Sequence, residues 1–204
     1  MRSIAVASAR TQTSPDLHTR HILLVTQALF FSSLIWCLAI YHGSIAERDG
    51  ISYYGVFHPT IPILVLGYLI ATIGLWRTAE YFKAAEIPRL TWAGLRVVGT
   101  LLLVLLVTPF NRGAVLNWTH MLAGVVGALF QLAISVKLLR EHRSARAVAG
   151  FVVQLVGGIV AAFSLPDWTF NYLLVGEILY QVGFGWCLIE WTYALGSREA
   201  LAWT

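Results

Sequence analysis

The chain has 204 residues, of which 58% are hydrophobic and only 12% are charged, and its formal net charge is +4 at pH 7. With a mean hydropathy of +0.72, it is far more apolar than a soluble domain of this size, so we expect an integral membrane protein. The basic residues are spread over several loops instead of forming one stripe, which argues against nucleic acid as a partner.

Six apolar segments are long enough to cross a hydrocarbon core about 30 Å thick. They lack the apolar and polar alternation of a spanning β-barrel, so the sequence predicts an all-α, polytopic transmembrane bundle of six helices. The second segment can extend through Arg77 and Glu80 if these side chains face protein or reach the headgroups. The predicted spans are residues 21–42, 61–76, 92–108, 119–139, 148–165 and 172–195.

Basic residues near the ends of the spans predict the orientation, because Lys and Arg are retained on the cytoplasmic side. Of the 14 basic residues, only Arg48 and Arg112 fall in the first, third and fifth loops. We therefore expect a multi-pass protein of the plasma (inner) membrane with both termini in the cytoplasm. In this arrangement residues 1–20 form a polar cytoplasmic arm, 21–195 the transmembrane domain and 196–204 a short cytoplasmic tail.

The first loop contains the stretch "ERDGISYYGVFHPT", which should face outward. Polar and titratable residues from the other outward loops are expected beside it. One interpretation is a polar pocket roofed by this loop, and the other is an aromatic belt with solvated polar groups between its rings. The residues concerned are His42, Asp49, Ser52, Tyr53, Tyr54, His58, Asn111, Arg112, Asn117, His120, Asp167, Asn171 and Glu177.

Glu177 lies inside the sixth predicted span, where a carboxyl group is costly unless it is paired, protonated or hydrated. Gln181 follows on the same helix face. In the fourth span, His120 begins a stripe of small and polar residues that continues through Gln131 to Ser135. If the two stripes face each other, Arg112 or His120 could compensate the Glu177 carboxylate. The alternative is that the glutamines only make interhelical hydrogen bonds that fix packing.

Three other features are expected to be structural. Glu190, near the cytoplasmic end of the last span, should reach the headgroups or pair with Arg96 or Lys137. The two cysteines, Cys37 and Cys187, lie at different depths and should be unpaired, buried thiols. Small residues at helix-packing spacing, as in Gly124 with Ala128, Gly157 with Ala161 and Gly158 with Ala162, favour close approach of helices.

The spacing of the histidines does not match a known metal or haem motif, and we expect no bound cofactor. Whether the outer histidines bind a metal ion stays open. The sequence has no serine hydrolase motif and no phosphate-binding glycine loop, so we do not expect an enzyme.

Two stretches resemble six-helix membrane proteins of the damage-regulated autophagy modulator superfamily and their bacterial relatives. In "DGISYYGVFHP" the resemblance rests on Ile51, Ser52 and Gly55. In "PFNRGAVLNWTHMLAGVVGALFQLAIS" it rests on an aromatic and polar loop that leads into His120. Tyr53 stands where an acidic residue is usual in the family. The resemblance implies a non-enzymatic membrane protein that senses or organises lipids.

The sequence therefore predicts an outward-facing polar pocket that binds a lipid headgroup or a small polar ligand. A small-solute or proton-coupled transporter or channel is the first alternative, and an outward-facing metal-dependent membrane hydrolase is the second. The expected partners are membrane lipids and a small polar ligand, and a homo-oligomer stays open. The candidate ligand-binding residues are Glu177, His120, His58, Tyr54, Asp49, Arg112 and Gln181.

Overall fold

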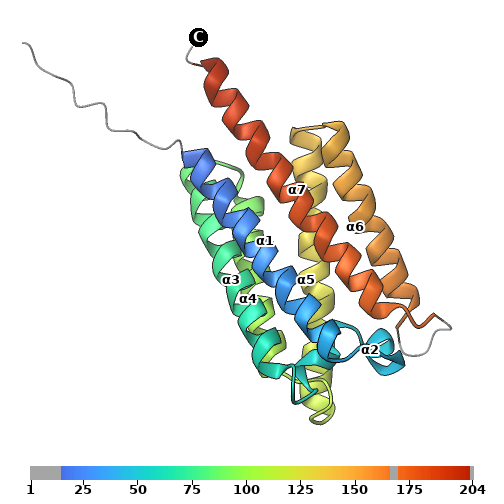
Figure 1. Ribbon diagram of the computed structural model, residues 1–204. Helices are drawn as coiled ribbons and strands as arrows, with labels where there is room; N and C mark the ends of the chain where they lie inside the picture. Colours follow the sequence, from blue (N-terminus) through green and yellow to red (C-terminus); the bar gives the residue numbers. More distant parts are fainter. Residues whose placement is uncertain (1–14, 166–169, 203–204) are drawn as a thin grey trace, which may run out of the picture.

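The computed structural model describes residues 15–165 and 170–202, and these residues are helical apart from short connections. Within these ranges, six helices are long and apolar enough to cross a membrane, which confirms the predicted six-helix bundle. Figure 1 shows them as one elongated bundle. The helices are α1 (Pro15–Ile40), α3 (Ile61–Ala84), α4 (Arg89–Val107), α5 (Ala114–Glu141), α6 (Ala145–Phe163) and α7 (Leu173–Ala202), with the short α2 (Ser44–Asp49) and 3-10 helix η1 (Ile51–Gly55) between α1 and α3.

The helix boundaries follow local sequence signals. Pro62 lies in the first turn of α3, where its missing N–H costs nothing, and α4 begins directly after Pro88. The α6 helix is capped by Ser144, whose hydroxyl accepts a hydrogen bond from the Ala147 amide at 3.0 Å. As expected, α3 continues through Arg77 and Glu80.

The first and the last helix both extend beyond the predicted transmembrane spans. The first helix begins at Pro15, so the last residues of the predicted arm are helical, while residues 1–14 lie outside the described residues. The last helix continues to Ala202 and includes most of the predicted tail. A helix continues beyond the apolar stretch because its backbone hydrogen bonds do not depend on the surrounding solvent.

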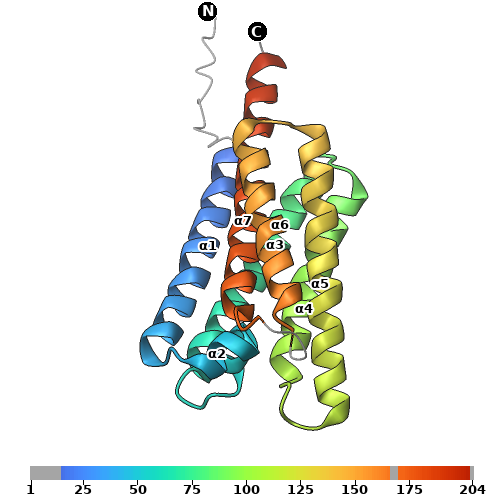
Figure 2. The ribbon, with the colours of Figure 1, turned by 90° about the vertical axis from the view of Figure 1, so that its right-hand side faces the viewer.

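The start of α1 and the end of α7 lie at the same end of the bundle, and α2 lies at the opposite end (Figures 1 and 2). The side of the membrane on which the termini lie stays a prediction. Hereafter the end of the bundle with the start of α1 and the end of α7 is called the basic end, and the end with α2 is called the loop end.

The closest helix contact is between α6 and α7. Gly157, Gly176 and Gly183 line it, and a Cβ at any of these positions would overlap backbone atoms of the facing helix. The predicted close approach is thus confirmed at Gly157, and Ala161 of the same pair also faces Gly176. At Gly124 it is not, because no atom lies within 4 Å of where a Cβ would be.

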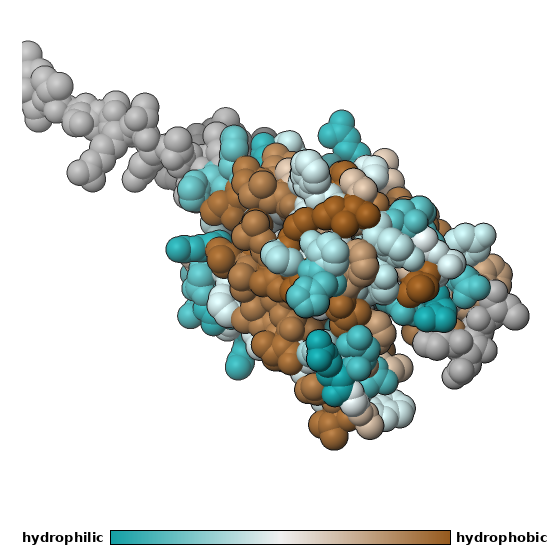
Figure 3. All heavy atoms as spheres, turned by 60° about the horizontal axis from the view of Figure 1, so that its bottom comes forward, coloured by the Kyte–Doolittle hydropathy of each residue, from teal (hydrophilic) through white to brown (hydrophobic). Residues whose placement is uncertain are grey.

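The buried apolar side chains form two clusters, one toward each end of the bundle. The cluster at the basic end includes Phe82, Leu188 and Trp191. The cluster at the loop end includes Tyr68 and also residues of α2 and η1, so this connection belongs to the core. Figure 3 brings the loop end forward and shows polar side chains among large apolar ones. Those exposed apolar side chains are what a bilayer would cover.

Candidate functional site

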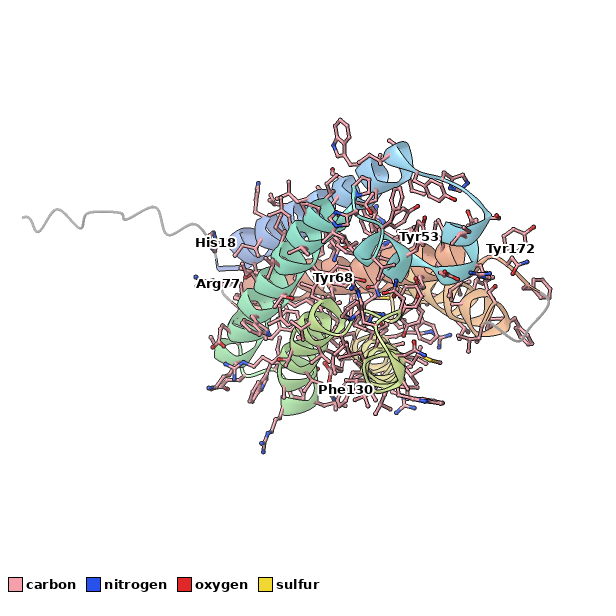
Figure 4. The ribbon with its side chains drawn as sticks, turned by 90° about the horizontal axis from the view of Figure 1, so that it is seen from below. His18, Tyr53, Tyr68, Arg77, Phe130 and Tyr172 are labelled. Carbon is pink, nitrogen blue, oxygen red and sulfur yellow. The ribbon has the colours of Figure 1, made fainter. Side chains whose placement is uncertain are left out.

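The connection between α1 and α3 is a folded segment that covers the loop end. We call residues 44–55, which comprise α2 and η1, the α2–η1 segment. Ala46, Ile51 and Tyr54 are buried, and the last two are at most 4% exposed. Both short helices contact α7, and Figure 4 shows η1, with Tyr53, lying across the bundle in the view from below. The sequence predicted this stretch as the roof of a pocket, and it did not predict its helices.

Tyr54 holds the segment to its flanking residues. Its hydroxyl donates to the Tyr41 carbonyl oxygen at 3.1 Å, and its own carbonyl accepts from the Thr60 hydroxyl at 2.8 Å. Burial raises the pKa of the Tyr54 phenol to about 12, so the phenol stays a protonated donor at neutral pH. Tyr54 therefore contributes to folding of the segment, whereas the sequence had placed it among the ligand-binding candidates.

Glu177 accepts a hydrogen bond from this segment. The Ile51 backbone amide donates to Glu177 Oε2 at 2.6 Å. Gly50, which joins α2 to η1, has φ 72° and ψ −162°, a conformation that is essentially restricted to glycine. A Cβ on Gly50 would also overlap the Glu177 carboxylate. Glycine is thus required here for backbone conformation and for the close approach of the carboxylate.

His120 makes a second connection between the segment and the long helices. The Ser52 hydroxyl and His120 Nε2 lie 2.7 Å apart, and His120 Nδ1 lies 2.6 Å from the Thr108 carbonyl oxygen. Because a carbonyl can only accept, Nδ1 carries the proton, and in the neutral ring Nε2 accepts from the serine. Consecutive residues of η1, Ile51 and Ser52, therefore bind α7 and α5.

These contacts correct one expectation about Glu177. Its carboxylate was expected to be compensated by Arg112 or His120, but Arg112 is exposed and both ring nitrogens of His120 bind other groups. The amide of Ile51 takes that place. Every residue except proline has a backbone N–H, so the residue types could not indicate which one donates to Glu177.

The remaining candidates do not gather around Glu177. Asp49 is bound by its neighbour Arg48, with Arg48 Nε 2.7 Å from Asp49 Oδ1, and His58 is exposed. Gln181 accepts from Gln131 Nε2 at 3.2 Å, which confirms that the α5 and α7 stripes face each other. Asp167 lies outside the described residues.

The aromatic-belt interpretation fits part of the loop end. Trp118 and Tyr172 are 70% and 57% exposed, as expected for side chains at a bilayer interface. Tyr53, in contrast, stacks on Phe57 with ring centroids 5.5 Å apart, and Tyr54 is buried. The two adjacent tyrosines therefore belong to the folded segment and not to the belt.

At the basic end, the expected partners of Glu190 are bound to other acids. Arg96 forms an ion pair with Glu80, and Lys137 Nζ lies 2.8 Å from Glu141 Oε1. The expectation that Arg96 or Lys137 compensates Glu190 is therefore wrong. The reason is geometric: Glu80 is on the helix that packs against α4, and Glu141 is one turn from Lys137 on the same helix.

Cys37 and Cys187 are buried, unpaired thiols, as predicted. Among the described residues, no group of three or more His, Cys, Asp or Glu side chains could hold a metal ion. Two cavities occur along the flank of the bundle, one of about 380 Å³ between α1, α6 and α7 and one of about 290 Å³ between α3 and α4. Neither is lined by Glu177 or His120.

The structure thus defines a helical membrane protein with two acceptor groups, Glu177 and His120, covered by a folded segment at the loop end. Comparison of the chain with models of known families, with curated proteins and with solved structures finds no match. The resemblance to the damage-regulated autophagy modulator superfamily stays a prediction.

Proposed function

We propose that this protein is a non-enzymatic membrane protein that binds a lipid headgroup or a small polar ligand beneath the α2–η1 segment. The proposal is carried by the hydrogen bond between the Ile51 amide and the half-buried Glu177 carboxylate. A carboxylate within a membrane-spanning helix is costly to retain for packing alone. Here it contacts one short segment, which a ligand with its own donors can displace.

The chemistry of the two side chains narrows the ligand class. Glu177 is an acceptor, and neutral His120 presents its acceptor nitrogen to Ser52. A ligand that replaces the Ile51 amide and the Ser52 hydroxyl must therefore supply N–H or O–H groups. Polyol and primary amine headgroups supply them, whereas a choline headgroup has no such donor.

The test is a thermal melt of the purified protein with dihexanoyl lipids that carry either an inositol or a choline headgroup. We expect the inositol lipid to raise the melting temperature of the wild type and not that of Glu177→Leu, and the choline lipid to have little effect on either. Hydrogen exchange at the Ile51 amide should quicken in the variant, while the long helices stay protected. An equal shift in wild type and Glu177→Leu would overturn the proposal.

A second candidate function rests on the pair of Ser52 and His120. A serine hydroxyl 2.7 Å from an imidazole, whose other nitrogen is fixed by the Thr108 carbonyl, has the arrangement of a nucleophile, a base and an orienting group. It favours a membrane hydrolase without a metal ion. The orienting group is neutral, so it fixes the tautomer but stabilises the imidazolium less than a carboxylate would.

A fluorophosphonate probe distinguishes this candidate. In the reaction, Ser52 Oγ forms a bond to phosphorus, fluoride leaves and His120 Nε2 receives the serine proton. Mass spectrometry should then find an adduct on Ser52 that is lost in His120→Ala. If Ser52 stays unlabelled in folded protein, the hydrolase is excluded and the binding proposal is unaffected.

A further inference from the structure

The cavity of about 380 Å³ is a groove on the flank of the bundle toward the basic end. It runs between α1 and α6 over α7, and its lining on α7 extends from Val182 to Tyr193, away from Glu177. Its lining is mostly aromatic and aliphatic, with Phe31 from α1 and Trp186 and Ile189 from α7, and two charged residues, Arg146 and Glu190, also line it.

Neither of these two charges belongs to the ion pairs among the described residues. Two other acids at this end, in contrast, are paired, Glu80 with Arg96 and Glu141 with Lys137. A guanidinium and a carboxylate that share a groove without pairing to each other can each bind a separate charge of a ligand.

A third cation lies beside the groove. The guanidinium of Arg20 lies over the ring of Tyr193, 3.6 Å from its centroid, and Tyr193 lines the groove. Arg20 Nε is buried and has no hydrogen-bond partner among the described residues. The groove therefore has two guanidinium groups near one carboxylate, an excess of positive charge that suits a phosphate.

The charged residues lie at the depth of lipid headgroups. Arg146 is in the first turn of α6, and Cys187 Sγ lies 3.8 Å from the Ala147 carbonyl oxygen, which fixes the register of α6 against α7. Glu190 follows Cys187 by about one turn, toward the same end as Arg146. Val182 and Phe31 continue the lining toward the middle of the membrane. The groove thus combines a charged end with an apolar, lipid-facing wall.

We infer that this groove binds one phospholipid with an ethanolamine headgroup. The phosphate lies at Arg146, the primary ammonium lies at Glu190, and an acyl chain follows the apolar wall along α7. A choline headgroup cannot donate a hydrogen bond to Glu190, and a glycerol headgroup brings no positive charge. The inference does not rest on the proposed function, because neither Glu177 nor His120 lines the groove.

The test is native mass spectrometry of full-length, delipidated protein in detergent. Equal amounts of phosphatidylethanolamine, phosphatidylcholine and phosphatidylglycerol with the same acyl chains compete for binding. The protein carries Glu177→Leu, so that the proposed loop-end site cannot contribute a preference for amine or polyol headgroups. We expect it to retain phosphatidylethanolamine about tenfold better than the other two lipids, because one charge-assisted hydrogen bond is worth about that factor.

Paired variants assign the preference to the groove. In the Glu177→Leu background, Glu190→Gln should bind the three lipids equally, and Arg146→Gln should bind all three more weakly. Matched controls at the same end and in the same background are Glu86→Gln and Arg143→Gln, two exposed residues outside the groove, which should keep the preference. The inference is overturned if Glu177→Leu does not discriminate, or if Glu190→Gln in that background still prefers ethanolamine while its melting temperature shows it to be folded.

Discussion

The last helix carries two glutamates whose surroundings differ. Glu177, at the loop end, accepts a hydrogen bond from the Ile51 amide beneath a folded segment. Glu190, toward the basic end, lines an open groove with Arg146 and has no ion pair among the described residues. The same residue type on the same helix is thus satisfied by protein in one place and presented to the surroundings in the other.

The difference follows from helix geometry. The two residues are 13 positions apart (190 − 177), which corresponds to about 20 Å along the axis and a rotation of about 220°. They therefore face nearly opposite sides of α7. Since α7 contacts α1, α5, α6 and the α2–η1 segment, each face meets a different neighbour. The rotation of α7 decides which acid is covered.

The largest expected effect comes from a change that forces the covered end open. Gly50→Ala should lower the free energy of unfolding by about 3 kcal/mol, because it strains the backbone and displaces the Glu177 carboxylate. Gly113→Ala is the matched control: Gly113 has φ 110°, but no atom lies within 4 Å of its Cβ position. It should cost only the strain, about 1 kcal/mol. Equal losses in a reversible unfolding assay would contradict the contact with Glu177.

The second connection of the segment can be measured as a coupling. His120→Ala should cost about 2 kcal/mol because it removes two hydrogen bonds, and Ser52→Ala about 1 kcal/mol. In a double-mutant cycle the two losses should fall short of additivity by about 1 kcal/mol, the energy of their shared bond. Strict additivity in the same unfolding assay would mean that Ser52 and His120 do not interact.

Conservative changes at the two glutamates test the comparison itself. Glu177→Gln replaces a charged acceptor with a neutral one and should lower stability by about 1 kcal/mol, with faster hydrogen exchange at the Ile51 amide. Glu190→Gln should change stability by less than about 0.5 kcal/mol, because Glu190 has no ion pair among the described residues. If both variants lose the same stability, the two acids do not differ as described.

The smallest effect concerns Tyr54. Tyr54→Phe should cost about 0.5 to 1 kcal/mol through loss of the bond to the Tyr41 carbonyl. Because folding raises the pKa of this phenol from 10.0 to about 12, the unfolded chain releases its proton first as the pH rises. Stability should therefore fall between about pH 10 and 12, and less steeply in Tyr54→Phe than in the wild type. Parallel pH profiles would contradict the burial of the hydroxyl.

Much of the fold could be predicted from the sequence, because the bilayer restricts the length, the composition and the secondary structure of a span. A span needs about 20 apolar residues, and lipid-exposed backbone must bond within its own helix, so the apolar segments alone predict six helices. The facing stripes of α5 and α7 could also be predicted, since helical spacing places Gln131 and Gln181 on continuous polar faces. The start of α1 and the end of α7 lie at the same end of the bundle because the number of spans is even.

The partners of the polar side chains could not be predicted in this way. Glu177 and His120 were recognised as unusual from their residue types, but their bonds go to the Ile51 amide and the Thr108 carbonyl, groups that every residue possesses. The pairing expected for Glu190 was wrong because Arg96 pairs with Glu80 and Lys137 pairs with Glu141. The apolar segments thus determined that the chain crosses a membrane six times. Only the packing of α7, by its rotation and by the path of the α2–η1 segment over it, decided which charges are covered and which face a groove.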